Sequence, residues 1–386
     1  MKEEHLWGIV APFKEGEELI KKAGGETAKL CFQCGLCTTI CPWNIVRHFI
    51  VHKMLRQTQF GLADTEDEGW WLCTTCGACV RRCPNGVGVI DVMTSVRKIM
   101  VEAGFMPVSL RTTMASLAGV GNPIREGRGK RADWAQGLGV KMFTRGTELL
   151  YFPCCTAAYD SRVRKVARAT AEILQKAGVD FGILGVEESC CGESVRKAGN
   201  ESLFRSLAQR NIDVFTKAGV NDILVTSPHC YTTFKTEYPE LGGVYEVFHL
   251  TQYLAKLLKA GRLKFNKQLN KRVVYHDPCY LGRHNGIYDE PREILSSIPG
   301  LELVELPDSR ETSICCGGGG GRIWQDTKKG ERLSDLRLEH VLESGADILA
   351  TACPYCIINF EDSLLTADKG NLIEIKDISE LVQEAL

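Results

Sequence analysis

The sequence predicts a multidomain α+β protein, in which an α-helical N-terminal module precedes two related α/β units. Three observations support this. Two compact cysteine runs lie before residue 84, apolar residues beside them recur at helical spacing, and the remainder repeats one pattern at a displacement of 125 residues. We expect a helical module over 1–110, a linker over 111–147, and α/β units over 148–262 and 263–386.

Composition narrows the class of protein. The chain has 386 residues, with 47 basic and 48 acidic residues and a net charge of −1. This balance argues against a protein that coats nucleic acid. No apolar run reaches the ~18 residues of a membrane span, and the N-terminus lacks a signal-peptide pattern, so a cytoplasmic location is expected. In a reducing compartment, 18 cysteines indicate metal binding rather than disulfides.

The two cysteine runs in the N-terminal module read CFQCGLCTTICP and CTTCGACVRRCP. Both follow the C-x-x-C-x-x-C-x-x-x-C-P spacing that holds cubane [4Fe–4S] clusters in bacterial ferredoxins, where the fourth cysteine serves the other cluster. Structural zinc is the alternative, but it usually takes separated C-x-x-C pairs. We therefore expect two cubanes, one bound by Cys31, Cys34, Cys37 and Cys83, the other by Cys73, Cys76, Cys79 and Cys41.

Helical segments are expected around both runs. Segment 42–60 carries Ile45, Phe49, His52 and Leu55 at helical spacing. A second helix begins near Val89 and ends before the glycine at position 104. The histidines at 48 and 52 lie one turn apart and could bind metal, although side chains that flank a cluster are the favoured interpretation.

Residues 119–147 are rich in glycine and arginine and show no sustained periodicity. This composition predicts a connector that runs over the surface. The basic stretch REGRGKR within it is the one candidate for nucleic-acid contact, but it lacks interleaved aromatic residues. We expect no nucleic-acid partner.

The rest of the chain is an internal repeat. Its matched elements are Pro153-Cys154 with Pro278-Cys279, Cys190-Cys191-Gly192 with Cys315-Cys316-Gly317, and Cys230 with Cys356. Ser227 stands where the second copy has Cys353, so the first copy lacks one thiol. Cys155 falls opposite Tyr280 and is expected to be an extra, packed thiol.

Each copy alternates strand-like and helical segments. The predicted strands are 148–152, 181–185 and 222–226 in the first copy, and 272–276, 301–306 and 347–351 in the second. Between the first two strands, a helix places Val163, Val166, Thr170 and Ile173 on one stripe. This alternation predicts parallel sheets with the cysteines at strand ends, in two units related by an approximate two-fold axis.

The motif C…CCG…C-x-x-C, repeated after a double ferredoxin module, resembles the CCG-domain family of iron–sulfur proteins. That family includes the B, C and D subunits of heterodisulfide reductase, the iron–sulfur subunit of glycolate oxidase and the K subunit of the sulfite-reductase-associated complex. The module order is most similar to the D subunit of heterodisulfide reductase. The resemblance implies one non-cubane [4Fe–4S] cluster, held by Cys279, Cys315, Cys316, Cys353 and Cys356. For the first copy, with Cys154, Cys190, Cys191 and Cys230, it leaves open a different iron centre or none.

Five thiolates around iron make an anionic site that dipoles and cations must compensate. The glycine run after Cys316 can aim N–H groups at sulfur, and Arg322 follows it. Arg283, His276 and His284 lie near Cys279 along the chain. Either histidine could give a proton to a leaving thiolate, or simply cap a turn. A phosphate cradle in the glycine run is disfavoured, because no Lys-Ser/Thr ending follows it.

Two functions fit these residues. The first is an electron-transfer subunit that passes electrons between the cubanes and the non-cubane centre. The second is a disulfide reductase in which Cys315, Cys316 and His284 would be catalytic. The chain has no flavin or nicotinamide fingerprint, so we expect it to work in a complex with a flavoprotein, a dehydrogenase or a membrane quinone-linked subunit. Such a partner would place it peripherally at the membrane.

Overall fold

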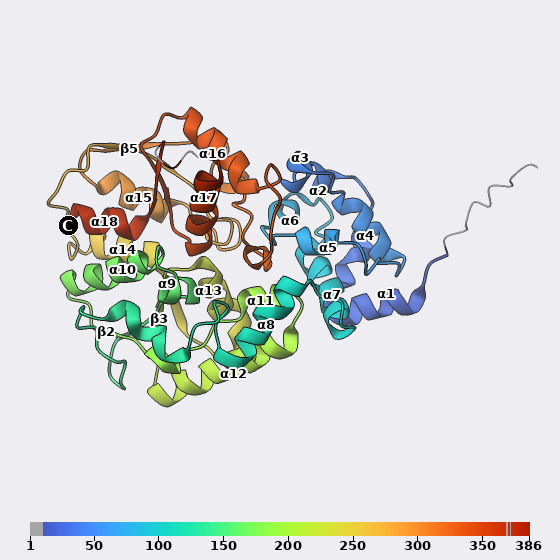
Figure 1. The fold of residues 1–386 in the computed structure, drawn as a ribbon, viewed down its shortest axis with the longest axis horizontal. Coiled ribbons are helices and arrows are strands. Elements are labelled where there is room, and N and C mark those ends of the chain that lie inside the picture. The colour runs from blue at the N-terminus through green and yellow to red at the C-terminus, as the bar shows by residue number, and fades with distance from the viewer. Residues whose placement is uncertain (1–10, 368–369, 371) are drawn as a thin grey trace, which may run out of the picture.

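A computed structural model describes residues 11–367, 370 and 372–386. The helical N-terminal module, blue in Figure 1, packs against one side of a larger body made of two α/β units. The first (unit 1) is green to yellow and the second (unit 2) orange to red, and they lie one above the other in that view. The predicted mixture of a helical module and two repeated α/β units is confirmed.

Short helices and cysteine-bearing turns make up the N-terminal module. Its core contains the buried side chains of Trp43, Trp70, Val92 and Met93. The helix predicted from Val89 is confirmed, since α7 ends at Glu102 and Gly104 has a positive φ of 85°. The elements are α1 (Lys14–Ile20), η1 (Lys21–Gly25), η2 (Glu26–Leu30), α2 (Leu36–Thr39), α3 (Trp43–Val46), α4 (Val51–Gln59), α5 (Gly69–Leu72), α6 (Ala78–Arg82) and α7 (Val89–Glu102).

The segment 42–60, where helical spacing was noted, forms two helices, α3 and α4, with a break between them. Arg47 leaves the helical conformation at φ −159° and ψ 161°. Its guanidinium contacts Glu331 of unit 2 at 3.2 Å. Phe49, in the break, is nevertheless buried in the core. The apolar spacing therefore marked Phe49 and Leu55 as buried, but Ile45 is 64% exposed and the helix is not continuous.

The segment 111–147, expected as a linker, contains regular elements and buried side chains. Helix α8 (Val108–Val120) crosses the expected boundary, and the 3-10 segment η3 (Arg128–Ala135) follows it. Leu117, Arg131 and Trp134 in these elements are each only 1% exposed. The edge of Trp134 packs against the ring of Tyr151 in the first strand. Burial of these side chains makes the segment part of unit 1.

Unit 1 is built on a parallel sheet with the strand order β2-β1-β3-β4. The strands β1 and β3 are apolar and wholly or mostly buried, which is expected for a sheet covered on both faces. Its elements are β1 (Leu149–Phe152), α9 (Cys155–Tyr159), α10 (Arg164–Lys176), β2 (Phe181–Gly182), η4 (Gly185–Glu187), α11 (Glu193–Lys197), α12 (Glu201–Ala218), β3 (Asp222–Val225), α13 (Pro228–Thr232), η5 (Thr233–Glu237), η6 (Tyr238–Leu241), β4 (Glu246–His249) and α14 (Leu250–Lys259).

Unit 2 repeats this topology with the order β6-β5-β7-β8, again fully parallel. Strands β4 and β8, which the sequence did not predict, close one edge of each sheet. The elements are β5 (Lys271–Tyr275), α15 (Asp289–Ser297), β6 (Leu301–Val304), η7 (Arg310–Thr312), η8 (Arg322–Trp324), α16 (Leu333–Glu343), β7 (Ile348–Thr351), α17 (Pro354–Thr366), β8 (Glu374–Asp377) and α18 (Ile378–Ala385).

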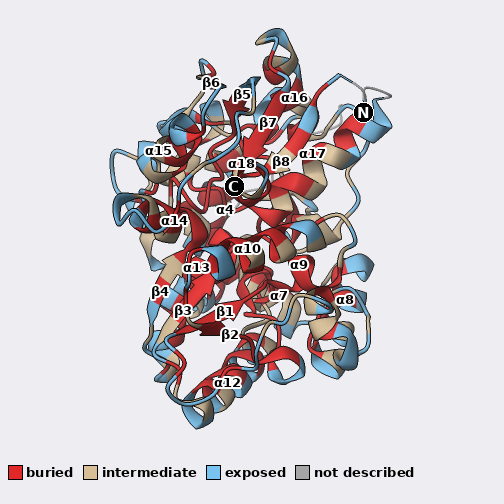
Figure 2. Cartoon of the chain, turned by 90° about the vertical axis from the view of Figure 1, so that its left-hand side faces the viewer, coloured by how far each residue is buried: buried red, intermediate tan, exposed pale blue. Residues whose placement is uncertain are grey.

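The two units contact each other through equivalent helices. Helix α10 packs on α18, and α14 packs on α15. Since α10 corresponds to α15 and α14 to α18, the two contacts are reciprocal, which is the pattern that a two-fold relation produces. Figure 2 shows the buried strands inside each unit and buried helix faces between them.

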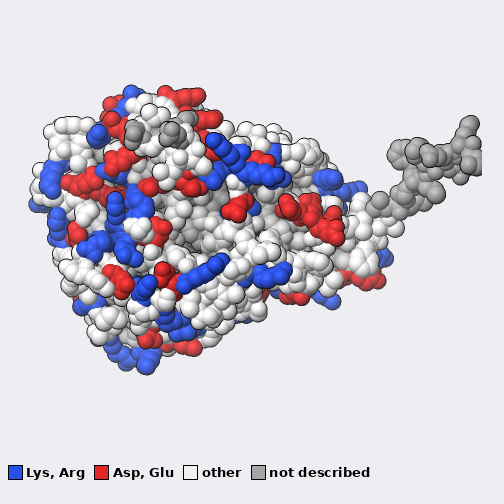
Figure 3. All heavy atoms as spheres, viewed as in Figure 1, with Lys and Arg blue, Asp and Glu red and all other residues white. Residues whose placement is uncertain are grey.

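The surface has mixed charge. On the face shown in Figure 3, basic and acidic side chains are interspersed over both units and the N-terminal module. Across the described residues, none of the helices combines the length and apolarity that a membrane crossing requires.

Candidate metal centres

Four thiols of the N-terminal module surround one small cavity. Cys31, Cys34, Cys37 and Cys83 line it, together with apolar side chains such as Leu55 and Val89. The backbone N–H of Val87 donates to the Cys83 sulfur at 3.3 Å. His52 also lines the cavity, and its Nδ1 lies 2.8 Å from the Thr38 hydroxyl. Cys83 thus lies with the first cysteine run rather than with its own.

The other four thiols of the module form a second group. Burial raises the pKa of Cys41, and the nearby Cys76 and Cys73 raise it further. Burial also raises the pKa of Cys79, followed by the effects of Cys73, Cys76, Cys41 and Cys37. Cys41 therefore lies with the second run. The contribution of Cys37 to the pKa of Cys79 shows that the two groups are neighbours.

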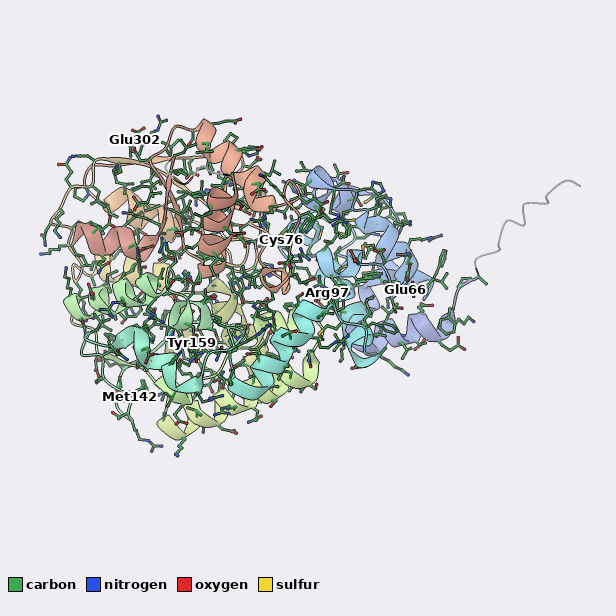
Figure 4. The ribbon with its side chains drawn as sticks, viewed as in Figure 1. Glu66, Cys76, Arg97, Met142, Tyr159 and Glu302 are labelled. Carbon is green, nitrogen blue, oxygen red and sulfur yellow. The ribbon has the colours of Figure 1, made fainter. Side chains whose placement is uncertain are left out.

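Arg97 of α7 fixes the second group against both α/β units. Its side chain is fully buried and donates four hydrogen bonds to backbone carbonyls. The acceptors are Trp70 at 2.7 Å, Cys73 at 2.6 Å, Lys197 of unit 1 at 2.9 Å and Gly320 of unit 2 at 3.0 Å. Figure 4 labels Arg97 at the boundary between the N-terminal module and the α/β body. This position joins a cysteine loop to both repeats.

The five cysteines of unit 2 converge at the carboxyl ends of β5 and β7. The Cys316 and Cys356 sulfurs lie 3.3 Å apart, and those of Cys279 and Cys315 lie 3.9 Å apart. Cys353 directly precedes α17 and is 1% exposed. As predicted from the glycine run, a backbone N–H points at sulfur, since Gly317 donates to Cys315 at 3.3 Å. All five side chains are buried.

Two buried basic side chains beside this group lack hydrogen-bond partners among the described residues. Both ring nitrogens of His276 are unpaired, and a nitrogen of this ring lies within 4.8 Å of the sulfurs of Cys316 and Cys356. All three guanidinium nitrogens of Arg337 are also unpaired, although its side chain is 0% exposed. Burial and then Arg337 lower the pKa of His276. An anionic group among the thiols would supply the charge and acceptors that these side chains lack, so the residues fit an iron–sulfur cluster.

The second group of the N-terminal module meets the unit 2 group directly. The neighbouring Cys315 thiol and then burial raise the pKa of Cys76, and both thiols line one cavity. The Cys315 sulfur also lies 3.7 Å from the Thr74 hydroxyl. The buried Arg283 secures this contact, donating to the Cys76 carbonyl at 2.8 Å and to the Ser313 carbonyl at 2.5 Å. Cys76 is labelled at this junction in Figure 4.

The glycine run brings its backbone against the cysteine loop of the N-terminal module. A Cβ on Gly319 would lie 2.3 Å from the Thr74 carbonyl, and one on Gly320 would lie 2.4 Å from that of Cys73. Such distances exclude any side chain at either position. Arg322, which the sequence suggested as a compensating cation, instead donates to Thr327 at 2.6 Å and stacks over Trp43.

His284 lies at the same junction. Its Nε2 is 2.9 Å from the Thr75 carbonyl, and its ring stacks on Tyr280 with centroids 4.2 Å apart. Burial lowers its pKa to about 4, so the ring is neutral at pH 7 and can donate from Nε2 to that carbonyl. The Tyr280 hydroxyl lies 2.8 Å from Thr75 Oγ1. Both residues thus hold the turn between Cys73 and Cys76.

The sequence did not indicate a role for His229, which precedes Cys230 in unit 1 but contacts residues of unit 2. Its Nδ1 lies 3.0 Å from the Glu193 carboxylate, and its ring stacks on Tyr280. Although burial lowers the pKa of His229, Glu193 and Cys353 raise it to about 10. Burial raises the pKa of Cys353, but hydrogen bonds from Cys356 and His229 bring it to about 5. A charged histidine from one repeat therefore stabilises a thiolate in the other.

Unit 1 gathers its own cysteines at the equivalent sheet edge. The Cys191 and Cys230 sulfurs lie 3.4 Å apart. Ser227, where unit 2 has Cys353, is 4% exposed and precedes α13. Cys155 is buried, as expected of a packed thiol, and the neighbouring Cys190 raises its pKa.

Comparisons with known proteins agree with this arrangement. The cysteine-rich domain family model matches residues 149–235 and 273–361, and the 4Fe-4S dicluster domain model matches residues 26–87. The D subunit of the dihydromethanophenazine:CoB–CoM heterodisulfide reductase of Methanosarcina mazei is 35% identical over 387 residues, covering 92% of this chain and 93% of that protein.

Two longer relatives also match. The "EtfAB:quinone oxidoreductase" of Syntrophomonas wolfei is 36% identical over 82% of this chain and 46% of its own length. The "Probable iron-sulfur-binding oxidoreductase FadF" of Bacillus subtilis is 37% identical over 83% of this chain and 47% of its own length. This chain thus spans about half the length of these two relatives. The repeated cysteine-rich domains, the dicluster match and the nearly full-length similarity show that the chain belongs to the iron–sulfur protein family that includes the heterodisulfide reductase D subunits.

Proposed function

We propose that the chain is an electron-transfer subunit of an oxidoreductase complex, with two cubane [4Fe–4S] clusters in the N-terminal module and a non-cubane [4Fe–4S] cluster in unit 2. Cys31, Cys34, Cys37 and Cys83 would bind the first cubane, and Cys41, Cys73, Cys76 and Cys79 the second. Cys279, Cys315, Cys316, Cys353 and Cys356 would bind the non-cubane cluster. Bound clusters supply one-electron carriers.

The contact between Cys76 and Cys315 carries this proposal. Each thiol belongs to a different group of proposed ligands, yet both line one cavity and Cys315 raises the pKa of Cys76. Arg283 and Gly319 keep the two backbones close enough for that contact. Cys37 of the first group also contributes to the raised pKa of Cys79 in the second, so these two groups are neighbours. We propose that the three ligand sets form one continuous series.

The mixed charge of the surface and the relatives' names favour a redox partner. One relative is named for EtfAB and quinone, and another as a reductase subunit. We propose that a flavoprotein, a dehydrogenase or a quinone-linked subunit exchanges electrons with this chain, which would place it at the membrane only through that partner.

A Gly319→Ala variant tests the relay. Its new Cβ would meet the Thr74 carbonyl at 2.3 Å and push unit 2 away from the Cys73–Cys76 turn. In the anaerobically purified full chain, we expect a reductant to reduce the N-terminal clusters normally, but to reduce the unit 2 centre at least tenfold more slowly in rapid-freeze EPR experiments. Gly129→Ala is the control, because nothing lies within 4 Å of a Cβ at that position. Equal rates in wild type and Gly319→Ala would refute the proposed route.

A cavity favours a second function, disulfide reduction. It measures about 410 Å³, lies between the N-terminal module and unit 2, and is lined by Cys76, Cys315, Arg283 and Ser313. The Ser313 hydroxyl is buried and unpaired. A small substrate could therefore reach the proposed ligands Cys76 and Cys315.

Turnover by the isolated chain distinguishes the two functions. Reduction of a disulfide takes two electrons and two protons and releases two thiols. If the chain is a relay, it will accept electrons from a chemical reductant without reducing disulfides. Steady disulfide reduction that is lost in Cys316→Ala would establish the second function, and His284→Gln would then test proton delivery through its effect on the pH–rate profile.

A further inference from the structure

One thiol of the N-terminal module reaches the molecular surface. Among the 18 cysteines, all of which lie in the described ranges, Cys34 alone is exposed. The other ligands proposed for the three clusters are buried or half-buried. Cys34 belongs to the first group, which in the proposed series is the end opposite to the unit 2 centre. Because electron tunnelling slows steeply with distance, the shortest route between this series and a second protein ends at Cys34.

Apolar side chains surround this thiol and are left exposed. Phe32 and Leu36 line the same cavity as Cys34, and they are 57% and 47% exposed. Ile40 follows one helical turn after Leu36, since its N–H donates to the Leu36 carbonyl at 3.1 Å, and it is exposed as well. Large apolar side chains gathered on a surface in this way are typical of a site that meets another protein.

The segments that carry the thiols of the module have only basic charge. Residues 27–60 and 73–90 contain six lysines and arginines and no aspartate or glutamate. Within the described residues, Arg47 alone among these six forms an ion pair. The acidic side chains of the module include those at 64–68, between the two segments. Figure 4 labels Glu66 at the lower right of the module, whereas α2 and α6 lie at its upper left in the same view of Figure 1.

Two exposed cations border the apolar side chains. Helix α2 contacts both α4, which carries Lys53, and α6, which carries Arg82. Arg82 lines the cavity between the N-terminal module and unit 2 together with Ile40. Asp308 and Glu311 of unit 2 line the same cavity, so the basic surface ends there. An apolar patch with a basic border is complementary to a partner that carries the opposite charge around an apolar contact.

We propose that the surface formed by Phe32, Cys34, Leu36, Lys53 and Arg82 (the docking face) binds an acidic one-electron redox protein, with the edge of that protein's cofactor against Cys34. The inference rests on the proposed relay and adds the place where electrons enter it. In each encounter the partner's cofactor is oxidised by one electron and the first cubane is reduced by one. Opposite charges accelerate such an encounter, and a small contact area lets the partner leave again.

Stopped-flow mixing of the anaerobically purified full chain with a reduced acidic flavodoxin tests the docking face. At low ionic strength, the second-order rate of cluster reduction should be about tenfold or more lower in Lys53→Glu/Arg82→Glu than in wild type. Added salt should shrink this difference, because it screens exposed charges. Arg210→Glu/Lys217→Glu is the matched control. It reverses the same two charges on α12 of unit 1, where both side chains are exposed and form no ion pair with described residues.

A third variant tests the apolar part of the docking face. Leu36→Asn should slow electron transfer from flavodoxin at high salt too, because contact between apolar side chains is not screened. Photoreduced deazaflavin, a small reductant that needs no docking face, is applied to the same samples, and EPR spectra are recorded. Missing cubane signals, or a unit 2 centre that stays oxidised while the cubanes are reduced, would refute the relay itself.

With the relay intact, four results would overturn the docking face. The first two are equal flavodoxin rates in wild type and Lys53→Glu/Arg82→Glu, and equal slowing in Arg210→Glu/Lys217→Glu. The third is a wild-type dimer in sedimentation that Leu36→Asn dissociates, because the face would then belong to a second copy of the chain. The fourth is binding to phosphatidylglycerol vesicles that Lys53→Glu/Arg82→Glu abolishes, because the basic border would then serve a lipid surface.

Discussion

Replacement of Arg97 by methionine should release the N-terminal module from the two repeats. The substitution keeps much of the side-chain volume but removes four hydrogen bonds to the carbonyls of Trp70, Cys73, Lys197 and Gly320. At about 1 kcal/mol for each bond, the loss is about 4 kcal/mol. This agrees with the ~3–5 kcal/mol that breaking a buried charged network usually costs.

Hydrogen exchange measures this loss where it occurs. A reduction of about 4 kcal/mol in local opening free energy should accelerate exchange about a thousandfold for amides in 70–76 and 317–321. Lys98→Ala on the same helix is the control, because the Lys98 side chain forms no ion pair or hydrogen bond within the described ranges. Cluster absorbance should be recorded in parallel. Unchanged exchange in Arg97→Met, or an equal acceleration in Lys98→Ala, would refute the role of Arg97 as an inter-module contact.

Three further predictions concern individual side chains. Cys41→Ser should damage the centre of Cys73, Cys76 and Cys79 and spare that of Cys31, Cys34 and Cys37; EPR spectra that show the reverse would contradict the crossed arrangement. Cys353→Ser should remove the unit 2 signal and leave both cubanes, and its survival would place that cluster elsewhere. Glu193→Gln should cost about 3 kcal/mol near neutral pH by breaking the buried pair with His229. Burial raises the pKa of Glu193, but His229 outweighs this and the pKa falls from 4.5 to about 2. The pair therefore stabilises the fold above pH 4.5, and this stabilisation is lost as pH falls towards 2. Because the pKa of His229 is raised from 6.5 to about 10, the stabilisation is also complete below pH 6.5 and lost as pH rises towards 10. Thermal unfolding under nitrogen should show this alkaline loss in the wild type but not in Glu193→Gln.

The sequence predicted the features that depend on local spacing. The two cysteine runs, the repeated CCG motifs and helix α7 could be read because each is written within a short segment or at a fixed displacement. Strands β4 and β8 were missed since they contain only two apolar residues and one, respectively, whereas β1, β3 and β7 contain three or four. Their place in the sheet comes from pairing with β3 and β7, which local propensity does not encode.

The missed site residues share a different cause. His229 and Arg97 act on groups that are distant in the sequence, and only packing of the modules brings them together. Arg131 lies in a glycine-rich segment whose composition indicates exposure, yet Glu188 and Cys155 provide partners for its charge. Cys155, to which the repeat alignment assigns no equivalent, is buried as expected.

The position of His229 has a consequence for how the duplicated halves diverged. His229 occupies the place that Tyr355 holds in unit 2, and it stabilises a thiolate across the boundary. The copies are therefore no longer interchangeable, since exchanging these two residues would leave Cys353 without its cation. Either half, produced alone, would lack a side chain that the other contributes. The thiolate form of Cys353 in the second copy thus depends on a side chain of the first.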